Sequence, residues 1–248
     1  MDPGSSSPNS WLITKLGSPA DISASERAVI ESLPLVIRQI PPHIDVVSEG
    51  DTPNICGLVL DGFACRYKVL QGGQRQILSF HMRGDMPDLH GMFLKTVDHS
   101  VGSLTAMTVG FIAHDVLHRA MEAEPGLGRL LWRETLIDAA IFREWLVSQG
   151  RRTATQQIGH LICELFVKMR AVGLVEDHSM IIPFTQQELG DALGLSTVHV
   201  NRVLQELRHS GLITGHRSTI VVPDWERLKI YSEFSPTYLH VRPELAAS

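Results

Sequence analysis

The chain has 248 residues, of which 44% are hydrophobic and 20% charged, and its formal net charge at pH 7 is −5. This balance is typical of a globular protein, and the length suffices for one large domain or two ordinary ones. No apolar run is long enough to cross a bilayer, and the first ten residues lack the basic-then-apolar order of a signal peptide. We therefore expect a cytoplasmic protein that has no membrane partner.

The cysteines exclude several kinds of site. Cys56, Cys65 and Cys163 form no CxxC pair, which favours neither a disulfide framework nor a zinc site. An iron–sulfur cluster with four thiolate ligands would need a fourth cysteine. The sequence therefore predicts no metal ligands, and thiols that are buried or half-buried.

The first half of the chain is expected to form a flexible N-terminus, residues 1–20, and a β-domain, residues 21–124. Residues 1–10 are rich in Pro, Gly, Ser and Asn. Ser23 and Glu26 have the spacing of a capping box and predict a short helix that ends near Pro34. From residue 37 to about 111, short β-type runs alternate with turn pairs such as Asp61-Gly62. This texture predicts an all-β sandwich or barrel.

A long helix is predicted over residues 125–150, before a C-terminal domain at 151–248. Its apolar stripe is wide enough to pack on the β-domain and to pair with a second copy of the chain. The stripe consists of Leu127, Leu130, Leu131, Ile137, Ile141 and Trp145. The polar run at 149–152 is interpreted as a hinge, and a further helix is expected from Ala154 to Met169, followed by a loop at 172–179.

Residues 185–209 predict two helices joined by a tight turn. Thr185 and Glu188 form a second capping box, Gly194 supplies the turn, and Ser196 is a good N-cap for the second helix. Val200, Val203, Leu204 and Leu207 give that helix a buried face. Residues 211–222 then predict two short strands around a turn. Together these features are typical of a winged helix-turn-helix, and an ordinary helical hairpin is the alternative.

The negative total charge does not exclude DNA binding. Between Ser196 and Arg217, Arg202, Arg208 and Arg217 stand against Glu206 alone. Phosphates respond to this local excess within a Debye length rather than to the charge of the whole chain.

In the stretches 57–85, 185–213 and 216–222, the chain resembles the Crp/Fnr family of bacterial transcription regulators. The resemblance implies an α+β fold with an N-terminal β-roll (a jelly roll like that of cyclic-nucleotide-binding domains), a long dimerisation helix and a C-terminal winged helix-turn-helix. It also implies a homodimer without catalysis that binds a palindromic double-stranded DNA operator and has RNA polymerase as a partner.

The resemblance also assigns roles in DNA recognition. The base readers are Thr197, Val198, Asn201 and Arg202, of which Arg202 reads guanine. Many members have a glutamate at the position of Val198. Because valine cannot accept a hydrogen bond from cytosine, we expect a half-site that keeps the guanine and differs at the neighbouring base pair. The expected phosphate contacts are Thr185, Gln186, Ser196, His199, His216 and Arg217.

The cyclic-nucleotide determinants of the family are degenerate here. An ungapped alignment from Gly84-Asp85 puts Asp88 and Leu89 where a Gly-Glu pair holds the ribose. It puts His99 and Ser100 where an Arg-Ser pair holds the phosphate, and only the serine is retained. We therefore expect no response to cyclic AMP.

Other effector hypotheses remain open. The oxygen-sensing members use an N-terminal cysteine cluster, whereas no cysteine precedes Cys56 here. We expect no cofactor; haem on His81, Cys65 or His90, another small molecule in the roll, and no effector at all are the alternatives. A β-roll metal enzyme that uses His81, His90 and His99 is the rival from another class, although the His-x-His plus Glu grouping is absent.

Overall fold

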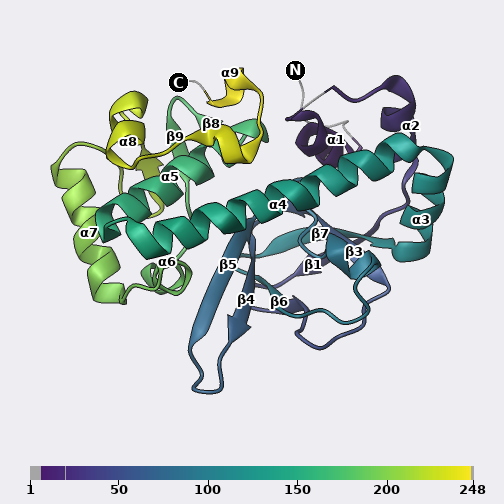
Figure 1. The fold of residues 1–248 in the computed structure, drawn as a ribbon, viewed down its shortest axis with the longest axis horizontal. Helices are drawn as coiled ribbons and strands as arrows, with labels where there is room; N and C mark the ends of the chain where they lie inside the picture. The colour runs from purple at the N-terminus through teal and green to yellow at the C-terminus, as the bar shows by residue number, and fades with distance from the viewer. Residues whose placement is uncertain (1–6, 20, 247–248) are drawn as a thin grey trace. The chain divides into compact units, whose positions relative to one another are not determined.

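The computed structural model describes residues 7–19 and 21–246. The chain divides into two compact units, Met1–Lys68 with Leu78–Leu136 and Val69–Ile77 with Ile137–Ser248 (Figure 1). None of the described helices combines the length and apolarity that crossing a membrane requires.

The N-terminal helix α1, Ser10–Gly17, corrects the expectation of a flexible segment over residues 1–20. Leu12, Ile13 and Leu16 form its buried face and join the core of the first unit. The Asn9 side chain anchors this helix, since Nδ2 donates hydrogen bonds to the carbonyl oxygens of Glu31 and Leu33. Burial of the apolar face of residues 11–16 therefore stabilises a helix, although the residues before it are polar. Residues 1–6 and 20 lie outside the described residues.

Two antiparallel sheets form the β-roll, as predicted. One has the order β1-β7-β3, with β1 at Val36–Ile40, β3 at Ile55–Asp61 and β7 at Met107–Ala113. The other has the order β2-β6-β4-β5, with β2 at Asp45–Val47, β4 at Ala64–Val69, β5 at Arg75–His81 and β6 at Ser100–Ser103. The predicted Asp61-Gly62 turn lies between β3 and β4, and Gly62 has a positive φ of 83°. This conformation suits a residue without Cβ.

Strand β3 is buried on both faces. Its successive side chains point in turn into two separate core clusters. Leu58 and Leu60 point into one cluster with the helices α1, α2 (Ala24–Ser32) and α3 (His114–Ala123). Val59 points into a second cluster with Val101 and Val109, which lie on the other sheet and on β7. The predicted capping box is present, because Ser23 Oγ accepts the Glu26 N–H and the Ser23 N–H donates to Glu26.

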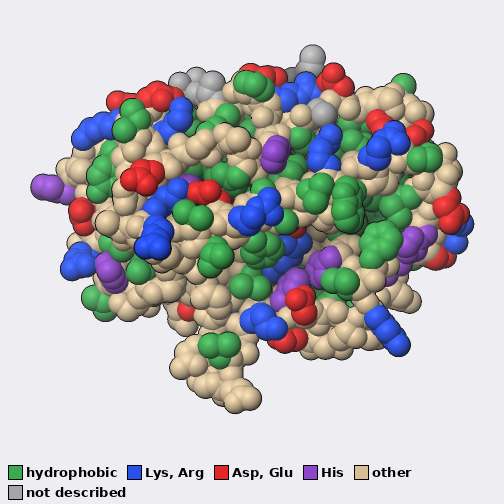
Figure 2. All heavy atoms as spheres, viewed as in Figure 1, with side chains coloured by type: hydrophobic (Ala, Val, Ile, Leu, Met, Phe, Trp, Pro, Cys, Tyr) green, Lys and Arg blue, Asp and Glu red, His purple; other side chains and the backbone are tan. Residues whose placement is uncertain are grey.

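The long helix α4 runs from Pro125 to Arg151, close to the predicted range. All six residues of its predicted stripe are buried within the chain: Leu127, Leu130, Leu131, Ile137, Ile141 and Trp145. Other apolar side chains of the helix face solvent instead, and Trp132 and Leu146 are 64% and 73% exposed. Figure 2 shows hydrophobic side chains over the course of α4 on the viewed face.

The second unit is built around α5, Ala154–Ala171, which is buried over most of its length. The expected loop at 172–179 is instead part of a hairpin of β8, Val175–Glu176, and β9, Ser179–Ile181. Asp177 and His178, both at positive φ, make its turn. Strand β10, Thr219–Val221, pairs with β9 rather than with residues 211–213, so the predicted two-stranded wing is reduced to the Thr214–Val221 bridge.

The C-terminal segment packs on this unit through α8 (Trp225–Tyr231), η2 (Pro236–Leu239) and α9 (Pro243–Ala246). Its anchor is the buried carboxylate of Glu164 on α5. The Tyr238 hydroxyl donates to Glu164 Oε2 over 2.8 Å, and Trp145 Nε1 donates over 3.0 Å. Burial raises the pKa of Glu164, so these donors stabilise a charge that the site otherwise disfavours.

Replacing Tyr238 by Phe is expected to lower the free energy of unfolding by about 1–3 kcal/mol, because a buried carboxylate loses a donor. Urea titration measures this loss. Tyr231→Phe, at a residue that is 40% exposed, is the matched control and should change stability by less than about 0.5 kcal/mol. Equal losses in the two variants would contradict the role of the Glu164 anchor.

Candidate DNA-binding surface

The helix pair at residues 185–209 forms as predicted. Helix α6 spans Gln186–Leu193 and α7 spans Thr197–His209. Thr185 Oγ accepts the Glu188 N–H, and the Thr185 N–H donates back to Glu188. Ser196 Oγ accepts the His199 N–H at the start of α7. Both helix starts thus follow from short side chains that satisfy backbone donors.

The turn between the helices depends on two glycines. Gly194 is left-handed with φ 69°, and its N–H donates to the carbonyl oxygen of Gly190. A Cβ added to Gly190 would collide with the carbonyl oxygen of Leu195. The close approach fixes α7 against α6 while Val200, Val203, Leu204 and Leu207 fill the interior.

The four predicted base readers share one exposed face of α7. Thr197, Val198, Asn201 and Arg202 line an open hollow together with Gln186 and Gln205. Val198 is 81% exposed, so its methyl groups are accessible at the edge of this hollow. Within the described part of the chain, Arg202 forms no salt bridge with Glu206.

Gln205 is a polar contact that the sequence prediction missed. Its Nε2 donates to Asn201 Oδ1 over 2.9 Å. The four-residue spacing on one helix was the available signal. This bond orients the amide of Asn201 within the hollow.

The predicted phosphate contacts divide between the helix starts and the wing. Thr185 and Ser196 are N-caps at the surface, and His199 is half-buried on α7. His216 and Arg217 are exposed at the turn that the Thr214–Val221 bridge closes, and Arg217 has φ 55°. Helix N-termini with uncommitted N–H groups favour anions.

The end of α6 is held by two glutamines that no sequence signal singled out. The carbonyl oxygen of Ala192 accepts hydrogen bonds from Gln76 Nε2 at 3.1 Å and Gln149 Nε2 at 2.9 Å. Arg75 also pairs with Asp191 at 2.8 Å. Residues 69–77 are part of the second unit, so these bonds satisfy a helix-end carbonyl within it.

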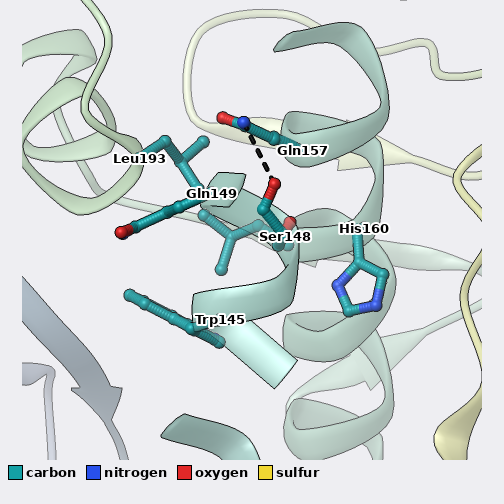
Figure 3. A pocket seen from close by; sticks show the side chains of 7 residues that line it. Trp145, Ser148, Gln149, Gln157, His160 and Leu193 are labelled. Atoms are coloured by element: carbon teal, nitrogen blue, oxygen red, sulfur yellow. Dashed lines mark hydrogen bonds between the residues drawn. The ribbon is translucent and has the colours of Figure 1, made fainter. Parts of the chain in front are cut away.

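Beside this contact lies a narrow hollow between α4, α5 and the end of α6 (Figure 3). Gln157 Nε2 donates to the carbonyl oxygen of Ser148 on one side of it. His160 is buried, and burial lowers the pKa of its ring to about 3. The ring is therefore neutral across the physiological pH range.

The predicted effector residues have structural partners in the first unit. Both oxygens of the Asp88 carboxylate accept the Gly57 N–H, at 2.9 and 3.0 Å, and Leu89 is buried on η1, Leu89–Met92. Ser100 Oγ accepts the Glu49 N–H. Asp88 therefore ties η1 to β3 instead of presenting an acceptor to a ribose.

The histidine among these residues is not a permanent cation. His99 Nδ1 lies 2.8 Å from Asp98 Oδ1, and burial lowers the pKa of the ring. The buried Arg66, which the sequence prediction missed, donates from Nε to the carbonyl oxygen of Pro87. At neutral pH His99 is thus a poor substitute for a phosphate-binding arginine.

The residues proposed for haem lie in different surroundings. Cys65 and His81 are both buried, and His81 Nε2 lies 2.8 Å from Ser79 Oγ. His81 Nδ1 lies 3.6 Å from Asp85. His90 is half-buried on η1, with its ring centroid 4.7 Å from that of His99. The structure thus brings His90 and His99 together and places His81 in a separate network.

Comparison with known proteins supports both units. Residues 156–231 match the model of the Crp-like helix-turn-helix domain, and residues 37–124 match that of the cyclic nucleotide-binding domain. The chain is 27% identical over 188 residues to the transcriptional activator protein FnrL of Cereibacter sphaeroides, covering 74% of this chain and 75% of FnrL. It is 29% identical over 169 residues to the nitrogen fixation regulation protein FixK of Bradyrhizobium diazoefficiens, covering 68% and 70%.

A solved structure shows the same fold. FixK2 from Bradyrhizobium japonicum is similar with a TM-score of 0.73 and 22% identity, covering 80% of this chain and 97% of that one.

The structural role of Asp88 predicts a pH-dependent effect on stability. Burial raises its pKa from 3.8 to about 6, so the folded state binds the proton more tightly than the unfolded state does. The contribution of Asp88 to stability therefore falls as pH rises from about 4 to 6. Asp88→Asn keeps an acceptor for Gly57 and cannot ionise, so it should gain about 1–3 kcal/mol relative to the wild type between pH 4 and 7.5.

Denaturant titrations across this pH range measure the difference. Asp115→Asn is the control at a side chain that is 67% exposed, and no such gain is expected there. A stability difference between wild type and Asp88→Asn that stays constant with pH would contradict the buried, raised-pKa carboxylate.

Proposed function

The chain belongs to the Crp/Fnr family of transcription regulators, and from this premise we propose that it is a homodimer that reads a palindromic duplex through α7. The observation that carries the proposal is the exposed face of α7. Side chains at the start of a recognition helix meet base edges in the major groove. Here that face carries a fork-shaped cation, an amide, a hydroxyl and an apolar methyl pair, all facing one open hollow.

Arg202 and Val198 define the expected half-site. The Arg202 guanidinium has no salt bridge to Glu206 in the described part of the chain, so its donors are available to guanine O6 and N7. The exposed valine suits a thymine methyl and offers no acceptor to cytosine N4. Half-sites of the Crp/Fnr family usually read TGTGA or TTGAT. The half-site of this chain therefore keeps the guanine and differs from these at the neighbouring base pair.

A row of exposed side chains on α4, with the half-buried Ala139 among them, supports dimer formation. Positions 132, 136, 139, 143 and 146 are separated by four and three residues alternately and carry Trp, Leu, Ala, Arg and Leu. This is the spacing of a coiled-coil seam. Because the six stripe residues predicted from the sequence are already covered within the chain, a second copy meets the row that includes Trp132, Leu136 and Leu146.

The relatives suggest how DNA binding is used. FnrL is named a transcriptional activator and FixK a regulator of nitrogen fixation. We extend transcription activation to this chain, with RNA polymerase as the partner. The family consists of regulators rather than enzymes, and we propose no catalytic step.

Arg202→Ala should weaken binding to the selected operator by roughly 1–3 kcal/mol and relax the preference for guanine. Its effect on random duplex DNA should be small. Fluorescence anisotropy with both duplexes at one salt concentration measures the two affinities.

Arg217→Ala is the matched control, since Arg217 is exposed at the wing turn. It should weaken binding to both duplexes by the same factor, because a phosphate contact carries no sequence information. Equal losses for Arg202→Ala on the two duplexes, or a selective loss for Arg217→Ala, would overturn these roles.

We further propose that DNA binding is independent of cyclic AMP. Two observations support this: the Asp88 carboxylate already accepts the Gly57 N–H, and the pKa of His99 is lowered. Calorimetric titration of cyclic AMP should give no binding at micromolar concentrations, in protein whose operator binding shows that it is folded. Micromolar affinity would contradict the proposal.

A further inference from the structure

Two histidines and an aspartate of the β-roll lie close enough together to hold a metal ion. His90 belongs to η1, whereas Asp98 and His99 directly precede β6. One potential ligand atom from each residue lies within 4.8 Å of the other two. Among the described residues, these three side chains form a group of His, Cys, Asp or Glu that could hold a metal ion. Ligand atoms of a tetrahedral ion are separated by about 3.3–3.6 Å, given metal–ligand distances of about 2.0–2.2 Å. The cluster therefore needs only a small contraction.

The cluster is backed by protein on one side and reaches solvent on the other. The His99 side chain is 11% exposed, whereas Asp98 is 78% exposed. Figure 2 shows histidine side chains beside acidic ones on the surface over the strands of the first unit. An ion can thus enter past the carboxylate and meet imidazole nitrogens that the fold has already enclosed.

The hydrogen bonding of His99 suits a ligand. Its Nδ1 lies 2.8 Å from Asp98 Oδ1, while its Nε2 is buried and has no hydrogen-bond partner among the described residues. A divalent ion can take the place of the proton that Asp98 Oδ1 and His99 Nδ1 share, since a metal ligand must be deprotonated. Both residues then bind the ion directly.

The segment that carries these residues is fixed at both ends. The carbonyl oxygen of His90 accepts the N–H groups of Phe93 and Leu94, and the Val97 N–H donates to the carbonyl oxygen of Asp51. Ser100 is anchored by the Glu49 N–H. The ligands therefore lie on backbone that is positioned by bonds outside the cluster, which lowers the cost of organising a site.

The donor set and the nearby charges restrict the ion. Nitrogen ligands favour borderline transition metals such as Zn²⁺ over Mg²⁺ and Ca²⁺, which prefer oxygen. The positive charge of Arg66 acts on the His99 ring, and Lys68 donates to the carbonyl oxygen of Asp98 while it pairs with Glu49. These cations weaken a metal site, so an exchangeable ion fits better than a permanent structural one.

We propose that His90, Asp98 and His99 bind one exchangeable divalent transition-metal ion of the Zn²⁺ type in the β-roll. The sequence analysis expected no metal ligands, and its alternative metal site grouped His90 and His99 with His81. The structure replaces His81 by Asp98 in the cluster. The proposal stands apart from DNA reading by α7, and its test contains no DNA.

Isothermal titration of Zn²⁺ into the chelator-treated full-length chain tests the site, and the visible absorption of bound Co²⁺ gives a second readout. The wild type should bind one ion in this site with about micromolar affinity. Asp98→Asn and His99→Gln should each weaken that binding by roughly tenfold or more. His118→Gln is the matched control, because His118 contacts Phe93 next to the cluster and is not one of the three ligands. It should bind as the wild type does.

Asp98→Asn keeps the test decisive if His99→Gln fails to fold, because the Asp98 side chain is largely exposed. The absence of Zn²⁺ and Co²⁺ binding in the wild type would overturn the proposal. Affinity that is unchanged in Asp98→Asn, or reduced equally in His118→Gln, would also overturn it, since the ion would then lie on other surface histidines.

Discussion

The close approach of Gly190 to the carbonyl oxygen of Leu195 positions the surface on which the proposed function depends. Any side chain at Gly190 would push α7 away from α6. With the two helices in contact, Val200, Val203, Leu204 and Leu207 are buried, and Val198 and Arg202 necessarily point outward. The same backbone constraint thus fills the interior of the unit and exposes the row of side chains proposed to read DNA.

The features predicted correctly from sequence were those set by local chemistry. Thr185, Ser23 and Ser196 cap helices with bonds that span three residues, and Gly194 takes the left-handed turn. The features that were missed depend on contacts distant in the chain. Helix α1 is stabilised by the core beneath it, and β8 is recognisable only through its pairing with β9. Gln76 and Gln149 both donate to the carbonyl oxygen of Ala192, and only the folded unit brings them together.

The β-roll retains the architecture of a nucleotide-binding domain while using its key positions differently. Asp88 holds η1 to β3, so a carboxylate that could meet a ligand serves the core instead. His99, aligned with a phosphate-binding arginine, lies beside Asp98 and His90. The proposed metal cluster therefore lies where the sequence alignment expected a phosphate-binding pair, with Arg66 nearby. Fold and ligand chemistry are thus separable in this unit.

Selection of random duplex DNA by the purified protein, without added effector and at a stated salt concentration, tests the central claim most directly. A dimeric reader predicts enrichment of a two-fold palindrome whose half-sites are centred about one helical turn apart. Each half-site should require the guanine opposite Arg202 and tolerate loss of the usual pair opposite Val198. Failure to enrich any sequence, or enrichment of a site without two-fold symmetry, would contradict the account of α7 and of the α4 dimer.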